Sequence, residues 1–302
     1  MEKTKSIKKA SIIGIISNLF LFIIKALIGF FTNSQAMIMD AFNSFSDIIS
    51  SAITFIGNRI ASRPRDDDHD LGHGKAEYFY SLIISILMFI LTFKVASGAV
   101  KALFAKETYI YSNWLLVVCA ITIILKFILY LYTNKIAKKY DNLLIKANSI
   151  DHRNDCFLTI GNMISAIFAS FGITTIDSIV SLMIAVWIFI SALGIFKNSY
   201  NVLMDKAISS ELKKRVLDII LSHDEVIKID HFNSTPIGYQ YQISFTIFVD
   251  GSLSTFASHN IANSLEKEIA RKVPEIFLTV VHVNPYDLPP KEEDAQDVLD
   301  IA

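Results

Sequence analysis

The chain has 302 residues, of which 52% are hydrophobic and 19% are charged, and its mean hydropathy is +0.45. A single water-soluble core cannot bury so much apolar surface, so the composition disfavours a soluble enzyme. The 28 basic and 29 acidic residues give a net charge of −1, which excludes the strong positive field that nucleic-acid binding needs. The two cysteines, Cys119 and Cys156, lie in apolar stretches that offer no disulfide framework and no cysteine zinc site.

Six segments of the first 200 residues approach the length of about 20 apolar residues that a helix needs to cross a bilayer. They are 11–31, 36–60, 78–100, 113–133, 147–171 and 176–200. The fifth is the least apolar, because charged side chains crowd its first half. Lysines and arginines gather before the first segment and in the second and fourth connections, which marks these regions as cytoplasmic. The sequence predicts six spans in the cell (inner or plasma) membrane, with both termini cytoplasmic.

After Tyr200 the pattern changes to that of a small soluble domain. Hydrophobic spacing and alternation predict a helix, two strands around a Pro236–Gly238 turn, a second helix and a last strand. The expected ranges are 209–222, 226–234, 238–249, about 252–273 and 276–283. This αββαβ order predicts a ferredoxin-like α+β fold.

The expected organisation is therefore an all-α transmembrane domain over 1–205 followed by a cytoplasmic ferredoxin-like domain over 206–288. Residues 289–302 begin with two prolines and continue acidic, which is typical of a disordered tail.

Two predicted spans carry pairs of oxygen-bearing side chains four residues apart, so each pair lies on one helix face. Asn43 and Asp47 lie in the second segment, and Asp151 and Asp155 lie in the fifth. If the two faces meet, they form a four-oxygen cage for a cation. The alternative is that these groups only join the helices by hydrogen bonds. Three carboxylates without balancing cations would repel strongly at low dielectric, which favours the cation site.

Other ionisable residues of the spans receive weaker roles. Asp40 shares the face of Asp47 and is expected to support the cage or line the path to it. His152 points about 100° away from Asp151, so a helix-interface role is favoured over metal binding. The lysines of the spans either reach toward the membrane surface or pair with a carboxylate, and none is assigned a transport role. They are Lys25, Lys94 and Lys126.

A second candidate metal site lies in the loop after the second segment, where Asp66, His69 and His73 have the types and spacing of metal ligands. A solvated acidic loop is an equal alternative. Three histidines of the soluble domain are dispersed in sequence but could converge in the fold, although structural or surface roles are equally consistent. They are His231, His259 and His282.

Four motifs in this order resemble the cation diffusion facilitator family. They are DAFNSFSD (40–47), DHDLGHGKAE (68–77), ANSIDHRND (147–155) and LMDKA (203–207). The resemblance implies a homodimeric exporter with six spans per subunit, which exchanges a divalent cation for protons by alternating access. It places the transported ion at the four-oxygen cage and a second ion at the loop triad. It also implies that Lys75 and Asp205 form a charge interlock at the dimer interface.

The ligand set departs from the zinc pattern of that family, in which a histidine typically occupies the position of Asp151. An oxygen-only cage suits manganese, whereas imidazole suits zinc. The set therefore looks like the bacterial manganese-efflux branch, with iron next and zinc third. In the soluble domain, Ser244, Phe245 and Thr246 lie where zinc relatives have a histidine, and Asn284 replaces a carboxylate. That domain is expected mainly to dimerise, with weak metal binding at most.

The metal is expected to be cargo rather than a cofactor, and the chain is not expected to be an enzyme. No glycine-rich phosphate loop, HExxH pattern or nucleophile motif is present in the sequence. A rival from another class is a membrane-bound metal sensor or scaffold, although a mere anchor does not need facing carboxylate pairs.

Overall fold

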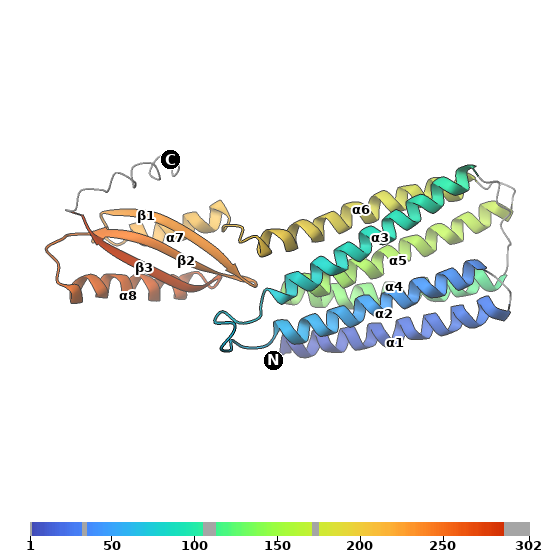
Figure 1. The fold of residues 1–302 in the computed structure, drawn as a ribbon, viewed down its shortest axis with the longest axis horizontal. Coiled ribbons are helices and arrows are strands. Elements are labelled where there is room, and N and C mark those ends of the chain that lie inside the picture. The colour runs from blue at the N-terminus through green and yellow to red at the C-terminus, as the bar shows by residue number, and fades with distance from the viewer. Residues whose placement is uncertain (1, 32–34, 105–112, 171–174, 287–302) are drawn as a thin grey trace. The chain divides into compact units, whose positions relative to one another are not determined.

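The structure is a computed structural model that describes residues 2–31, 35–104, 113–170 and 175–286 (Figure 1). The chain divides into two compact units, Met1–Tyr200 and Asn201–Ala302. The described part of the first unit is built from long helices that run side by side. They are α1 (Glu2–Phe31), α2 (Gln35–Ala61), α3 (Ala76–Phe104), α4 (Asn113–Tyr140), α5 (Leu143–Ser170) and α6 (Thr175–Leu203). Their positions agree with the six predicted segments.

Helix α2 contacts α1, α3 and α5. Small residues allow this close approach. A Cβ atom on Gly57 of α2 would lie 2.8 Å from Leu144 of α5 and equally close to Tyr80 of α3. Helix α5 also packs along α4. The bundle therefore holds α2 and α5, the two helices with paired oxygen ligands, next to one another.

The outer surfaces of the helices expose large apolar side chains, as a lipid-facing surface would. Within the described ranges, four helices are long and apolar enough to cross a membrane. These are the stretches Glu2–Ile28, Ala76–Lys101, Leu116–Tyr140 and Leu182–Leu203. Helices α2 and α5 have similar lengths but carry more polar side chains. The protein thus has the features of a multi-pass membrane protein, and the count of six spans stays a prediction.

The second unit has the predicted order of helix, two strands, helix and strand. Its elements are α7 (Ser210–Leu221), β1 (Lys228–Ile237), β2 (Gln240–Val249), α8 (Thr255–Lys272) and β3 (Ile276–Pro285). The sheet order is β1-β2-β3, with β1 antiparallel and β3 parallel to β2. Ser209 and Ser254 cap the two helices by accepting hydrogen bonds from Leu212 N and Ala257 N. The αββαβ order is confirmed, whereas the ferredoxin-like fold stays a prediction.

The turn between β1 and β2 differs from its predicted position. The strand continues through Pro236 and Ile237, which pair with Tyr241 and Gln240, and the chain turns at Gly238. Gly238 has a φ of 64°, which glycine adopts without steric cost. Pro236 is tolerated because β1 is at the edge of the sheet. The predicted tail, 289–302, lies outside the described residues, and the boundary at 205/206 stays a prediction.

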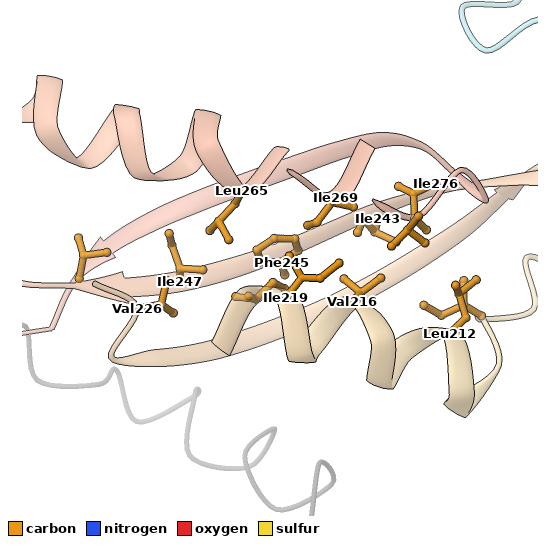
Figure 2. Packing of buried hydrophobic residues seen from close by; sticks show 14 residues of the cluster. Leu212, Val216, Ile219, Val226, Ile243, Phe245, Ile247, Leu265, Ile269 and Ile276 are labelled. Atoms are coloured by element: carbon orange, nitrogen blue, oxygen red, sulfur yellow. The ribbon is translucent and has the colours of Figure 1, made fainter. Parts of the chain in front are cut away.

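One apolar core holds the second unit together (Figure 2). Alternate residues of β2, namely Ile243, Phe245 and Ile247, point into it. Residues of both helices meet them there, including Val216 of α7 and Leu265 of α8. Both helices therefore cover the same face of the sheet.

We expect Phe245→Ala to lower the free energy of unfolding of this unit by about 3–5 kcal/mol, because it leaves a cavity in a closed core. Phe245 is 2% exposed and stacks on Phe232 with ring centroids 6.0 Å apart. Hydrogen exchange of the β1–β3 amides in the full chain measures the effect. Phe277→Ala is the matched control, because Phe277 is 54% exposed. Equal acceleration of exchange by both substitutions would contradict this account of the core.

Candidate functional site

A cavity of about 400 Å³ lies in the helical unit and is lined by residues of α1 to α5. The four residues of the predicted cage all line it: Asn43, Asp47, Asp151 and Asp155. Each of α2 and α5 contributes one pair, whose spacing of four residues places both side chains on the same face of the helix. The structure thus brings the four predicted ligands to one cavity, and their role as metal ligands stays a prediction.

The cavity also contains a buried cation that the sequence analysis did not place there. The Nζ atom of Lys126, on α4, lies 2.6 Å from Asp47 Oδ2 and 2.6 Å from Asp155 Oδ2. Its side chain is 1% exposed. These are short, charge-assisted hydrogen bonds to one carboxylate from each pair. The expectation of three carboxylates without nearby balancing cations is therefore wrong.

Two further lysines line the same cavity. Lys94 Nζ donates a hydrogen bond to Asn43 Oδ1 at 3.3 Å, and Lys25 Nζ donates to Ser44 Oγ at 3.1 Å. Among the residues that the structure describes, the lining holds three lysines and three aspartates, whose formal charges cancel. Counter-charges lower the cost of burying ionised groups, so the cavity without cargo is electrostatically tolerable.

Asp151 differs from the other two carboxylates. It is 5% exposed, and its Oδ2 atom has no hydrogen-bond partner in the described part of the chain. The Oγ1 atom of Thr122, another lining residue, is likewise buried without one. Leaving a buried polar atom unpaired is costly, so such atoms call for an explanation such as a bound ion or water. Both oxygens belong to residues that line the cavity, where an ion or a water molecule could contact them.

The three carboxylates of the cavity lie too far apart to coordinate one ion together. Among the described residues, only the loop triad has three His, Cys, Asp or Glu side chains whose ligand atoms all lie within 4.8 Å of one another. In the cavity, the Lys126 ammonium stands between Asp47 and Asp155. For all the predicted ligands to coordinate one ion, the Lys126 ammonium and the carboxylates around it would therefore have to change position.

The structure describes the side chain of His152 but not that of Asp40, the two other ionisable residues considered near the cage. His152 is fully buried but does not line the cavity, and its ring nitrogens have no hydrogen-bond partner among the described residues. This agrees with the geometric argument against it as a ligand. Asp40 belongs to α2, but its side chain lies outside the described residues.

The loop triad assembles as a compact group. His69 Nδ1 lies 3.1 Å from Asp66 Oδ1, and His73 Nε2 lies 3.5 Å from Asp66 Oδ2. Desolvation acts against the shift, but the hydrogen bond from His69 and the charge of His73 lower the pKa of Asp66 below its ordinary value. The positive φ of 75° at Gly72 forms the turn between the histidines. The three side chains have the donor set of a metal site, and metal binding there stays a prediction.

The structure does not bring together the residues of the remaining predicted sites, which are three histidines and one charge pair, within the described parts of each unit. The three histidines of the second unit that the sequence singled out are exposed and do not form a group of close ligand atoms among the described residues. They are His231, His259 and His282. Lys75 belongs to the first unit and Asp205 to the second, so their interlock stays a prediction.

Long apolar helices around a cavity lined by carboxylates and ammonium groups are the features of a membrane protein with ionisable groups inside its helical bundle, where such groups are candidates for a functional site. The chain belongs to the cation efflux family. Residues 11–204 match the cation efflux transmembrane domain, and residues 208–286 match the cytoplasmic domain of cation efflux proteins. This family consists of transporters rather than enzymes.

Relatives resemble the chain over nearly its whole length. The manganese efflux system protein MneP of Bacillus subtilis (strain 168) is 28% identical over 292 residues, covering 94% of this chain and 98% of the relative. The manganese efflux system protein MneS of the same strain is 29% identical over 294 residues, covering 95% and 99%. The magnetosome protein MamM of Magnetospirillum gryphiswaldense is 24% identical over 266 residues, covering 87% and 84%.

Proposed function

We propose that the protein exports Mn²⁺ from the cytoplasm in exchange for protons, with the ion bound by Asn43, Asp47, Asp151 and Asp155. The observation that carries the proposal is that these side chains, from two neighbouring helices, line one cavity in which Asp151 Oδ2 is unpaired. Membership of the cation efflux family supports the general activity, divalent cation export.

The donor set supports manganese as the cargo. The four side chains offer only carboxylate and amide oxygens, which suit harder cations such as Mn²⁺, whereas zinc sites favour nitrogen and sulfur ligands. The names of MneP and MneS describe manganese efflux. Iron is the second candidate and zinc the third. Since intrinsic affinity rises along the divalent series toward copper, selectivity for manganese must come from ligand type and geometry.

Exchange with protons follows from the charge of the site. A divalent ion needs ionised carboxylates, while protons on the same carboxylates neutralise them, so the two kinds of cation exclude each other. The carboxylates should take up protons as a coupled set. Moving α2 and α5 relative to the other helices would open the cavity first to the cytoplasm and then to the outside.

The remaining parts of the proposal concern assembly. We propose six spans per subunit, both termini in the cytoplasm and a homodimer that the second unit helps to form. Lys75 and Asp205 are proposed as an interlock in that dimer, and Asp66, His69 and His73 as a second metal site. A metal sensor anchored in the membrane is the alternative from another class.

Metal flux into proteoliposomes tests this function. With the purified chain, an imposed pH gradient should accelerate Mn²⁺ uptake, and uptake should carry protons the other way. Mn²⁺ should move faster than Fe²⁺, Zn²⁺ or Cd²⁺ under the same gradient. Passive Mn²⁺ flow that ignores the gradient would indicate a channel, and the absence of flux for every metal would favour the sensor.

A further inference from the structure

We propose that Lys126 is a tethered competitor of the cargo: its ammonium group occupies the metal position when the site is empty and must leave before the ion binds. The inference rests on the proposed function, since it assumes that Asp47 and Asp155 are ligands. It adds a residue on α4 that determines affinity and release.

The geometry makes simultaneous occupation unfavourable. Divalent cations bind carboxylate oxygens at about 2.0–2.6 Å, and Lys126 Nζ lies 2.6 Å from Oδ2 of both Asp47 and Asp155. An ion that bridges these two oxygens would therefore lie where the ammonium lies. Two cations so close together inside the protein would repel strongly. The cargo must displace the ammonium to use this pair of oxygens.

The position of Lys126 within the lining provides space for the displaced group. The cavity has a volume of about 400 Å³, and Thr122, Lys94 and Lys126 itself are among the residues that line it. A lysine side chain has a flexible four-carbon stem and carries three donors, so it can change partners without moving its helix. The displaced ammonium would then move into the open space of the cavity rather than into packed apolar side chains.

This competition has a direct consequence for affinity and turnover. While the ammonium occupies the site, the protein is not competent to bind, and the apparent Kd rises by the inverse of the competent fraction. An occupancy of about nine-tenths makes the apparent Kd about tenfold weaker than the intrinsic value. The returning ammonium also helps expel the ion, and it leaves Asp47 and Asp155 paired after release.

The test is Mn²⁺ binding and flux by the full-length Lys126→Met variant at constant pH. We expect a Kd about tenfold lower than in the wild type, by the same competent-fraction relation, together with a reduced maximal flux. A purely structural lysine would give the opposite sign, because its loss would disorder the ligands and weaken binding. Lys94→Met is the matched control. This variant removes an equal charge from the lining, but the hydrogen bond of Lys94 goes to the neutral Asn43 amide, so we expect a much smaller gain in affinity.

If Lys126→Met does not fold, amine labelling of the wild type decides the question. Mn²⁺ should increase acylation of Lys126, detected by mass spectrometry, while the labelling of Lys8 near the N-terminus stays constant. Unchanged or decreased labelling of Lys126 on Mn²⁺ binding would overturn the proposal, as would unchanged or weaker Mn²⁺ binding by a folded Lys126→Met variant. Failure of the wild type to bind or move any divalent metal would instead remove the proposed function.

Discussion

Replacing Asp47 with alanine should reduce Mn²⁺ flux by about 100-fold or more. This reduction corresponds to a rise of about 2.7 kcal/mol in the activation free energy of transport. Asp47 is a carboxylate of α2 that lines the cavity, and its Oδ2 atom is one of the two that accept hydrogen bonds from Lys126. The variant lacks a charged ligand, and Lys126 loses one of its two carboxylate partners while it keeps Asp155. Flux into proteoliposomes measures the effect, and size-exclusion chromatography checks that the variant has the same oligomeric state as the wild type.

Two matched variants make the Asp47 result specific. Asp47→Asn keeps the shape and one oxygen ligand but removes the charge, so its flux should lie between those of the wild type and the alanine variant. Asp224→Ala removes an exposed carboxylate of the second unit and should leave the flux unchanged. Retained flux in Asp47→Ala would take this residue out of the transport site.

Asp151→His should shift selectivity from manganese toward zinc by about tenfold or more in relative flux, because imidazole is a preferred zinc ligand. Asp151 is the suitable position because its Oδ2 atom is buried at the cavity without a hydrogen-bond partner among the described residues. A nitrogen ligand placed there would therefore break no existing hydrogen bond of that atom. Competition between Mn²⁺ and Zn²⁺ in the same vesicles measures the ratio directly.

The control for the selectivity change is Asp151→Asn, which removes the same charge but keeps an oxygen donor. It should lower the flux of both metals without favouring zinc. An unchanged ratio in Asp151→His would show that ligand type at this position does not set selectivity. A zinc preference that Asp151→Asn shares would assign the effect to charge rather than to the nitrogen ligand.

Periodicity predicted much of the architecture. Helical runs of about bilayer length located the helices α1 to α6 that the structure describes, and alternation located the described strands β1 to β3. Spacings of four residues predicted which oxygens share a helix face, and the structure places Asn43, Asp47, Asp151 and Asp155 around one cavity. These features follow from local geometry, which one sequence contains. The β1–β2 turn was misplaced because a proline usually marks a turn, whereas an edge strand accommodates Pro236.

The role of the lysines could not be read in the same way. Lys126 lies on α4, far in sequence from both of its partners, and its pairing depends on how α4 packs against α5. The available signal was the free-energy cost of burying a charged lysine. A lysine inside an apolar span needs either an acidic partner or access to the membrane surface. That signal predicts that the partner is a carboxylate, but it does not predict which one. The packing of the helices determines that the partners are Asp47 and Asp155.

Anomalous scattering from Mn²⁺ bound to the crystallised protein tests the central claim most directly. The account predicts an anomalous peak in the cavity between α2 and α5, within coordination distance of Asp47, Asp151 and Asp155, with the Lys126 ammonium moved away from its two carboxylates. A second peak at Asp66, His69 and His73 would be compatible with this result. A peak at the loop alone, with the cavity unchanged under saturating Mn²⁺, would contradict the account.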